Sequence, residues 1–455
     1  MALVKHKISA YSPMRVIFLS YIAVIFLGSI LLCLPVSQNG QTPPLSFGDC
    51  FFTSASSVCV TGLVVVPTAV HWTFFGQLVI LVLIQIGGLS MITVAGFIFI
   101  VTGRKLGFRN RLLLQNSFNH TQMGGMVKFV KTVIKGTALF ELSGAVLLSL
   151  YFCVFKDMGL GKAAYNGIFH AVSAFCNAGF DVLGTNSLMD YSGDVYVNVV
   201  IMILILVGGI GFFVWQDVVK RLRDKRHRLS VTTKLAMFTT LFLFCAGGAY
   251  FFFAEYNNPE TIGNFPVWHK ILASVFQSAT LRTAGFASIN QTGLKEASKF
   301  VSSILMMIGG SPGGMAGGMK TVTIAVIFSS IWSIVRGREG IRVLNRSISL
   351  KTLQKALAVS GIMIMLLFAF TAVLCVLEAN SPAADSFIDI MYECASALST
   401  AGVPMGITPH LLVSSKIILI AGMIIGRVGP ITVIYALTHT DTSVMQYPEE
   451  QVLIG

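Results

Sequence analysis

The chain has 455 residues, of which 55% are hydrophobic and only 11% charged, and its mean hydropathy is +0.79. A soluble globular domain carries about 25% charged residues, so this composition excludes one and indicates a membrane protein. The formal net charge of +13 does not indicate nucleic-acid binding, because the basic residues lie between apolar segments and have no interleaved aromatic platform. The eight cysteines have no metal-ligand spacing, and neither a zinc site nor a disulfide framework is predicted.

Eight apolar segments are predicted to cross the membrane, because each is long enough for a hydrocarbon core of about 30 Å. In chain order they are residues 16–35, 74–102, 127–155, 195–219, 232–254, 299–335 with an interruption, 356–377 and 411–438. The first follows Lys5, Lys7 and Arg15, as the apolar core of a signal peptide does. Its apolar run is longer than such a core and no small-residue cleavage site follows, so we expect a first membrane helix.

The connections between these segments alternate in charge, and this alternation predicts their orientation. The N-terminus and the stretches 104–135, 220–234 and 336–355 hold 23 of the 32 Lys and Arg residues. The alternate connections hold 12 of the 19 acids. Cytoplasmic loops carry an excess of Lys and Arg, so both termini and the basic stretches are expected in the cytoplasm. The acidic connections are then outside, where they would concentrate cations.

Each outer connection contains a further apolar stretch of about 12 residues, which as a helix rises only about 18 Å and cannot span a membrane. We expect these stretches to re-enter. Each ends at a glycine that has Ser or Ala six residues before it. The four glycines are Gly62, Gly179, Gly285 and Gly402, separated by 117, 106 and 117 residues. This spacing predicts four repeats of about 110 residues. Their ranges are 1–125, 126–229, 230–350 and 351–445, followed by a tail at 446–455.

The segments around these glycines are the candidate cation site. Non-helical backbone at membrane depth is tolerated where it lines a cavity, and four such segments around one axis would present carbonyl oxygens that replace water around a monovalent cation. The short helices point their partly negative C-terminal ends at this axis, and the lack of a carboxylate ring favours potassium over a divalent ion. The predicted filter residues are Val60, Thr61, Gly62, Asn177, Ala178, Gly179, Thr283, Ala284, Gly285, Thr400, Ala401 and Gly402.

The sixth segment is interrupted at 309–320 by six glycines and a proline, which cannot hold a continuous helix. One interpretation is a flexible plug that gates conduction, and the other is helix packing through small residues four apart. Arg427, inside the last span, is expected to hold the plug or to form an electrostatic barrier, and pairing with an acid such as Glu141 is the alternative. The predicted gate residues are Gly309, Gly310, Ser311, Gly313, Gly314, Gly317, Gly318, Lys320 and Arg427.

At these residues the chain resembles the membrane subunits of bacterial Ktr potassium uptake systems, in the superfamily that also holds Trk and the plant HKT transporters. The resemblance covers essentially the whole chain. It implies an all-α membrane fold with eight spanning helices and four re-entrant pore helices in pseudo-fourfold arrangement around one pore. It also implies selectivity at the four glycines, a gate loop from Gly309 to Lys320, and a functional arginine at Arg427. A serine in the first loop is associated with sodium-preferring plant members, so Gly62 implies potassium.

The resemblance further implies a homodimer in the bacterial inner membrane, with one pore in each protomer. Its partner would be a cytosolic ring of RCK/KTN-type (KtrA-type) nucleotide-binding subunits, and ATP or ADP would bind to that ring and not to this chain. Sodium is implied as an activator. Candidates for docking the ring are the stretches 220–234 and 336–355 and the tail 446–455. The alternative is that their basic residues only set the orientation of the chain in the membrane.

Two other classes of function are weighed against a pore. An alternating-access cation transporter would also use broken helices, but all four repeats start on the same side, which favours a pore. An intramembrane enzyme is not indicated, because the eight histidines form no ligand-spaced pair and no Ser/His/Asp set converges in the spans. We therefore expect a non-enzyme that passes potassium down its electrochemical gradient.

Overall fold

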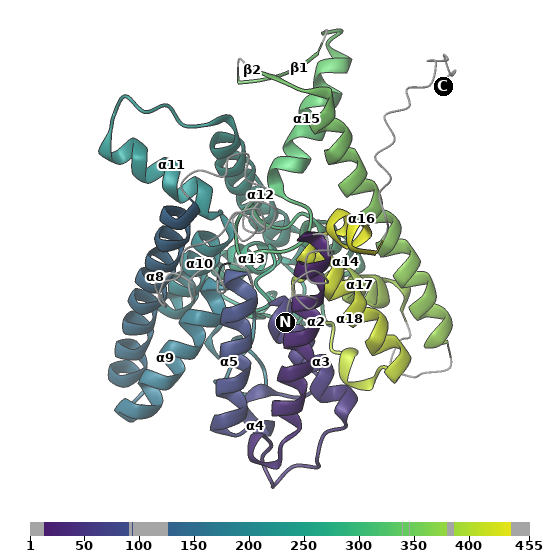
Figure 1. Cartoon of the computed structure of the whole chain (residues 1–455). Helices are drawn as coiled ribbons and strands as arrows, with labels where there is room; N and C mark the ends of the chain where they lie inside the picture. The colour runs from purple at the N-terminus through teal and green to yellow at the C-terminus, as the bar shows by residue number, and fades with distance from the viewer. Residues whose placement is uncertain are drawn as a thin grey trace, which may run out of the picture.

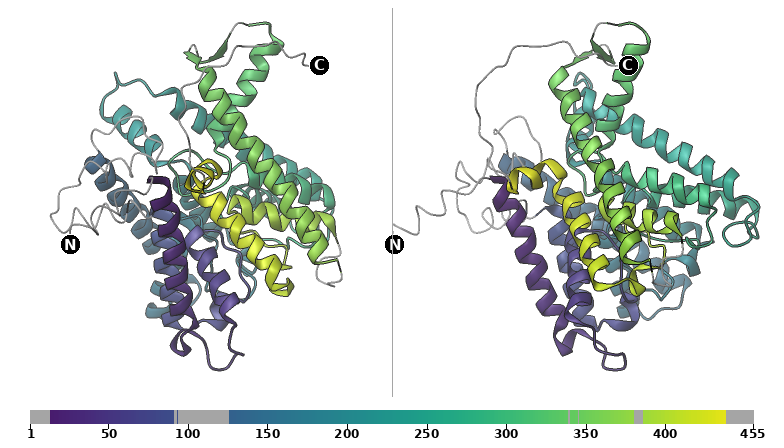
Figure 2. Two further views of the ribbon diagram at one scale, coloured as in Figure 1. Left: turned by 45° about the vertical axis from the view of Figure 1, so that its right-hand side comes forward. Right: turned by 90° about the vertical axis from the view of Figure 1, so that its right-hand side faces the viewer.

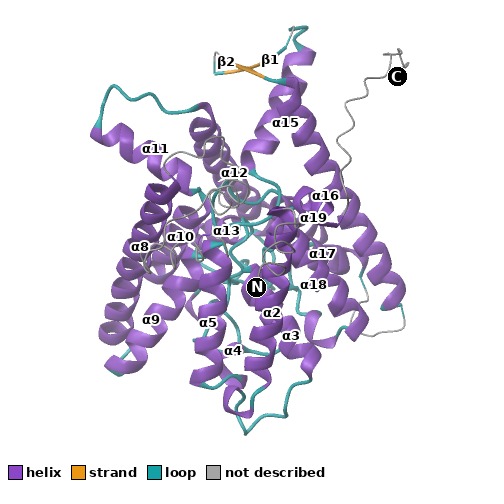
Figure 3. Ribbon diagram, in the orientation of Figure 1, coloured by secondary structure: helices purple, strands orange, loops and turns teal. Residues whose placement is uncertain are grey.

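The computed structural model describes residues 13–90, 93, 126–338, 340–344, 346–379 and 386–437. Several predictions fall outside these ranges: the basic residues Lys5 and Lys7, most of the basic stretch 104–135, the repeat boundaries near 125 and 445, and the docking candidate 446–455. Within the described residues the fold is helical except for one short hairpin (Figure 3).

Four long helices each begin one of the predicted repeats (Figure 1). They are α2 (Pro13–Cys33), α8 (Met126–Phe155), α12 (Val231–Glu255) and α16 (Leu350–Leu377). Each is long and apolar enough to cross a membrane by itself, which confirms four of the predicted spans. Their outward faces carry large apolar side chains, such as Leu139 and Phe238 with exposed fractions of 66% and 70%. Such surfaces are compatible with lipid tails, which are as apolar as leucine.

A shorter helix follows each long helix and packs against it. These pore helices are α3 (Phe47–Cys59), α9 (Leu160–Phe175), α13 (Val267–Thr280) and α17 (Phe387–Ser399). The four are too short to span a membrane, and each ends a few residues before one of the four repeated glycines. They are the re-entrant helices that the length of the short apolar stretches predicts.

The second spanning segment of each repeat is short or broken. These second helices are α5 (Phe74–Leu89), α10 (Val195–Gly209) with α11 (Phe212–Arg223), α14 (Glu296–Met307) with α15 (Thr321–Val335), and α18 (Val413–Val428) with α19 (Pro430–Leu437). The α10–α11 pair bends by 96° and the α18–α19 pair by 103°. The prediction of unbroken spans over 195–219 and 411–438 is therefore wrong. Gly211 (φ +97°) and Gly429 (φ +95°) adopt backbone angles that only glycine reaches easily, and the chain turns there.

Each second helix packs against the pore helix of the next repeat, so the four repeats close into a ring. Where the ring closes, α19 lies beside α2, and the two are yellow and purple in both views of Figure 2. Contacts join α5 to α9, α10 to α13, α14 to α17, and α18 back to α3. The pore helices are therefore enclosed by spanning helices, and their C-terminal ends meet at the centre of the fold.

The remaining elements lie in the connections. The hairpin of β1 (Ile341–Val343) and β2 (Arg346–Ile348) is antiparallel and falls in the predicted basic stretch 336–355, where no strand is predicted from sequence. Ile341 and Val343 pack against Leu235 of α12, which explains why the strands form there. Short helices occupy the opposite connections: η2 (Pro35–Ser37), α4 (Thr68–His71), η3 (Met189–Tyr191) and η4 (Thr408–His410). The hairpin and α4 lie at opposite ends of the molecule (Figure 1).

Candidate functional site

The four repeated glycines lie side by side in a closed ring. A Cβ atom placed on Gly179 would lie 2.5 Å from the Cα of Gly285, and one on Gly62 would lie 3.3 Å from the Cα of Gly179. On the other side of the ring, a Cβ on Gly402 would lie 2.8 Å from the Cα of Gly62, and one on Gly285 would lie 3.2 Å from the Ala401 carbonyl oxygen. The backbone of the four segments thus meets around one centre, with no room for side chains at these positions.

The backbone leaves each pore helix through the same sharp turn. The residue two positions before each glycine has a left-handed φ, and so does the glycine itself. The non-glycine residues are Val60 (φ 56°), Asn177 (φ 59°), Thr283 (φ 63°) and Thr400 (φ 53°). In three repeats the amide one position before the glycine donates to the carbonyl five residues earlier, as in a Schellman cap. These bonds are Thr61 to Ser56 (2.8 Å), Ala178 to Ser173 (2.7 Å) and Ala401 to Ser396 (2.8 Å).

Backbone carbonyl oxygens lie beside the four glycines, those of Thr61, Ala178, Ala284 and Ala401. All twelve predicted filter residues are buried, and none of them is acidic. The hydroxyls of Thr61, Thr283 and Thr400 are buried without a hydrogen-bond partner. Among the described residues no cluster of His, Cys, Asp or Glu could hold a metal ion. A site that offers neutral carbonyl oxygens suits a large monovalent cation better than a transition metal or a divalent ion.

The loop between α14 and α15, residues 308–320, lies directly against this ring. A Cβ atom on Gly317 would collide with the Thr400 hydroxyl and would lie 2.7 Å from the Ser399 carbonyl oxygen. The loop is not helical, so the alternative of helix packing through its glycine pairs does not apply. The predicted plug residues are thus placed next to the fourth filter segment.

Backbone hydrogen bonds fasten the loop to the bend between α10 and α11. Ser311 donates to the Gly209 carbonyl (2.9 Å) and Met315 to the Gly208 carbonyl (3.1 Å). Phe212, the first residue of α11, donates to the Gly313 carbonyl (3.0 Å). The bend at Gly211 therefore exposes carbonyl and amide groups that the loop uses.

Arg427 holds the loop from the opposite side. Its guanidinium donates to the Met315 carbonyl and to the carbonyls of Gly87 (2.6 Å) and Gly88 (3.0 Å) at the end of α5. The alternative pairing with Glu141 does not occur, because Glu141 instead accepts from Gln85 (3.1 Å). Arg427 thus connects α18 of the fourth repeat, the end of α5 and the loop.

Lys320, the last predicted gate residue, stays within the loop. Its ammonium group donates to the Ala316 carbonyl (2.7 Å), and neither Lys320 nor Arg427 forms an ion pair in the part of the chain that the structure describes. Both side chains are therefore held by backbone carbonyls.

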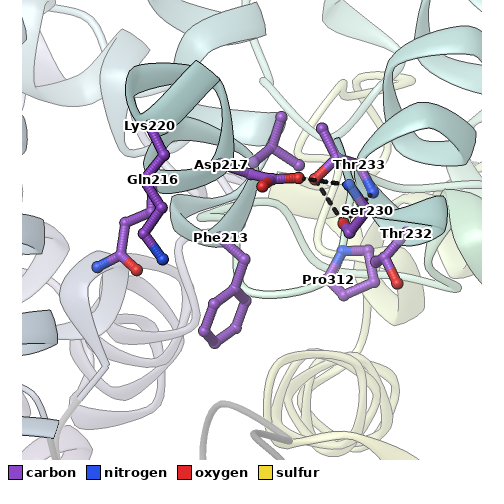
Figure 4. A pocket seen from close by; sticks show the side chains of 9 residues that line it. Phe213, Gln216, Asp217, Lys220, Ser230, Thr232, Thr233 and Pro312 are labelled. Atoms are coloured by element: carbon purple, nitrogen blue, oxygen red, sulfur yellow. Dashed lines mark hydrogen bonds between the residues drawn. The ribbon is translucent and has the colours of Figure 1, made fainter. Parts of the chain in front are cut away.

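A cavity of about 180 Å³ borders the far side of the loop (Figure 4). Pro312 reaches into it from the loop, and Phe213 and Asp217 from α11. Asp217 accepts from the Ser230 amide (2.8 Å) at the start of α12 and from His227 (2.6 Å). The loop is thus accessible from the predicted basic connection 220–234.

Several contacts of the site are missed at the level of sequence. Glycines of three second helices press against the carbonyl four residues before a filter glycine. These pairs are Gly87 with Val58, Gly208 with Phe175, and Gly426 with Leu398. The recurrence of glycine near the end of every second span could have indicated this contact. Likewise, two polar residues nine positions before a filter glycine, His170 and Glu393, accept the amides of Val182 (3.5 Å) and Met405 (2.9 Å).

Comparison with known proteins gives a consistent match. The family model described as "TrkH: Cation transport protein" matches residues 6–446. The Ktr system potassium uptake protein B of Bacillus subtilis is 38% identical over 98% of this chain and 97% of that protein. The potassium/sodium uptake protein NtpJ of Enterococcus hirae is 34% identical over 98% of this chain and 97% of that protein. The crystal structure of the potassium transporter TrkH from Vibrio parahaemolyticus has a TM-score of 0.73 at 18% identity and covers 95% of this chain and 86% of that one, which shows the fold.

Proposed function

Because this chain belongs to the TrkH family of cation transport proteins, we propose that it is the membrane subunit of a potassium uptake system. Potassium passes through a pore formed by the four filter segments, which replace its hydration shell with backbone oxygens. One observation carries this proposal: the four repeated glycines close into a ring with no carboxylate in it. The names of the relatives, which are potassium or potassium/sodium uptake proteins, support the same ion.

Ion movement follows the electrochemical gradient. A membrane potential contributes about 2.3 kcal/mol per charge per 100 mV, which is enough to drive accumulation through an open pore. The pore helices support entry of a cation, because each points its partly negative end at the ring.

The loop 308–320 acts as the gate. Its contact with Thr400 and its hydrogen bonds to Gly208 and Gly209 support a closed position under the filter. Arg427 holds it there through the Met315 carbonyl. Deletion of residues 309–318 is expected to raise potassium flux and loosen its regulation, whereas a correctly folded protein without flux would contradict this role.

A cytosolic ring of RCK/KTN-type nucleotide-binding subunits regulates the gate, and the subunit works as a homodimer in the bacterial inner membrane with both termini in the cytoplasm. The name of the Bacillus subtilis relative, protein B of a Ktr system, supports a partner subunit. The cavity between α11, α12 and Pro312 supports access from the basic side. ATP or ADP binds on the ring, and sodium activates uptake.

An alternating-access transporter is the second candidate, because α10–α11, α14–α15 and α18–α19 are all broken. The two candidates differ in coupling. A pore gives potassium flux that reverses at the potassium equilibrium potential whatever the gradient of another ion is. A coupled transporter shifts the reversal point when the sodium or proton gradient is changed.

The deciding experiment uses the purified protein in liposomes with a potassium gradient. We expect potassium flux well above that of empty liposomes and above sodium flux under the same gradient. Flux that is equal for both ions, or equal to that of empty liposomes, overturns the proposal. Uptake in cells that lack other potassium systems, with and without sodium and the partner ring, tests the regulatory part.

A further inference from the structure

Arg282 is a buried cation at the base of the third filter segment. It lies three residues before Gly285, just beyond the C-terminal end of α13, and only 5% of it is exposed. Its guanidinium donates to the Thr240 carbonyl (3.1 Å), to the Thr240 hydroxyl (3.3 Å) and to the Gly309 carbonyl (3.4 Å). One side chain thus connects the filter turn, the long helix α12 and Gly309 of the gate loop.

The position of this arginine in the repeat is informative. The corresponding residues of the other three repeats are Cys59, Cys176 and Ser399, none of which carries a positive charge. Cys176 also contacts the long helix of its own repeat, at Glu141 of α8 (3.7 Å). The third repeat is also the one whose second segment carries the gate loop. The long side chain therefore occurs in the repeat whose own second segment carries the gate loop, and it connects that loop to the third filter segment.

The surroundings of Arg282 do not neutralise its charge. The described partners of its guanidinium are a carbonyl and a hydroxyl of one residue and a second carbonyl, and its Nε has no hydrogen-bond partner. A buried charge held only by neutral groups is costly, although the partly negative end of α13 offsets part of this cost. A leucine or methionine would fill the same space without the penalty, so packing alone does not account for arginine here.

A small cavity beside Arg282 extends the connection to a second filter segment. It has a volume of about 10 Å³, close to the space that one water molecule needs, and Asn177, Gly209 and Gly310 also line it. Asn177 lies two residues before Gly179 in the second filter segment. The carbonyl of Gly209 accepts the amide of Ser311 in the gate loop (2.9 Å).

We propose that Arg282 is a positioning residue that couples the filter to the gate loop. With the loop closed, Gly309 and Thr240 hold the guanidinium, and the guanidinium holds the turn that leads into Thr283, Ala284 and Gly285. When the loop moves, the Gly309 carbonyl leaves and the third filter segment relaxes. Ion selectivity and the position of the loop are therefore linked. This inference rests on the proposed function, because it presumes a filter and a gate.

The test is a double-mutant cycle in liposomes that contain the full-length protein. The two changes are Arg282→Gln and a deletion of residues 312–317, which leaves Gly309 in place, and the readouts are potassium flux and the ratio of potassium to sodium flux. Coupling predicts that Arg282→Gln alone raises flux and lowers the ratio at least about threefold. In the Arg282→Gln background the deletion should then raise potassium flux by less than about twofold, although it raises potassium flux strongly in the wild type. Two results overturn the coupling. One is a double variant whose potassium flux changes by the product of the two single changes, and the other is an unchanged ratio of potassium to sodium flux in Arg282→Gln.

Variants of milder effect guard against misfolding. Arg282→Lys keeps the charge but loses the planar fork that reaches Thr240 and Gly309 together, so an intermediate shift of the flux ratio is expected. Thr240→Val removes one hydroxyl partner and should shift the ratio in the same direction, whereas Thr240→Ser should not. A purely structural role would reduce the amount of folded protein but leave the flux ratio unchanged. Wild-type protein without selective flux would refute the proposed function itself, while selective flux with independent factors would refute only the coupling.

Discussion

The ammonium group of Lys416 lies 2.8 Å from a carboxylate oxygen of Asp49, and this ion pair closes the ring of repeats. Lys416 is the fourth residue of α18 in the last repeat, and Asp49 is the third residue of α3 in the first. The same relationship joins the third repeat to the fourth, where Lys299 of α14 lies 2.7 Å from Asp389 of α17. Two of the four junctions between repeats thus use a lysine of a second helix and the N-terminal aspartate of the next pore helix.

Replacement of Lys416 with methionine should destabilise the protein by about 2 kcal/mol, between the values typical of exposed and of fully buried pairs. The pair is largely buried, with side-chain exposures of 11% for Lys416 and 20% for Asp49, so the remaining carboxylate is left without its partner. Thermal unfolding in detergent measures the effect. The additional change Asp49→Asn should recover part of the loss. Lys162→Met, at an exposed position, should shift stability by less than about 0.5 kcal/mol, and equal losses at both lysines would contradict the role of the junction.

Replacement of Gly285 with serine should lower the preference for potassium over sodium roughly tenfold, which corresponds to about 1.4 kcal/mol. A Cβ atom at Gly285 would lie 2.8 Å from the Cα of Gly179, so the ring of carbonyls must open. Ion-flux ratios in liposomes measure the change. Gly406→Ser is a matched control, because Gly406 has a similar φ of +79° but its Cβ would come no closer than 3.7 Å to the nearest atom, in Thr292. Unchanged selectivity in Gly285→Ser, or an equal loss in the control, would argue against the filter assignment.

The sequence predicts the apolar segments, the repeated glycine segments and the glycine-rich loop, and it misses the helix bends and the contacts between helices. Apolar length predicts the four long spanning helices, and the regular spacing of four glycines predicts the four glycine segments. The bends at Gly211 and Gly429 are missed because a single glycine in an apolar segment carries little information about helix direction. The glycine-rich loop differs from these bends, since six glycines and a proline within twelve residues exclude a helix without any knowledge of packing.

The contacts that connect the repeats depend on the folded ring and are not encoded in local patterns. Arg282 stands in a connection that is predicted to lie outside, and the packing of α13 against α12 brings it to Thr240 and Gly309. Arg427 is recognisable from the sequence as a cation within a span, but its partners are not. They are the carbonyls of Gly87, Gly88 and Met315, which can accept from it because α5 ends and the loop is not helical. Unsatisfied backbone groups of this kind arise from tertiary structure.

Replacement of Gly426 with alanine should destabilise the protein by about 1–3 kcal/mol. The added methyl group would collide with the Leu398 carbonyl at the base of the fourth filter segment, so α18 must move away from the pore helix. Gly361→Ala in α16 is the matched control, because its Cβ would meet no atom within 4 Å and alanine is the better helix former by about 1 kcal/mol. Thermal unfolding should therefore shift in opposite directions for the two variants. A shift in the same direction would contradict close contact at Gly426.

Replacement of Arg427 separates its charge from its hydrogen bonds. Arg427→Gln removes both the charge and most donors, so the gate loop loses its tie to α5 and potassium flux should rise at least about fivefold. Arg427→Lys keeps the positive charge but presents a compact ammonium that cannot bridge Met315, Gly87 and Gly88 as the guanidinium does. If the tie to the loop limits conduction, the lysine variant should resemble the glutamine variant in flux. If the charge itself limits conduction, the lysine variant should resemble the wild type. Flux in liposomes at matched protein content distinguishes the two results, and reduced flux in both variants would contradict a restraining role for Arg427.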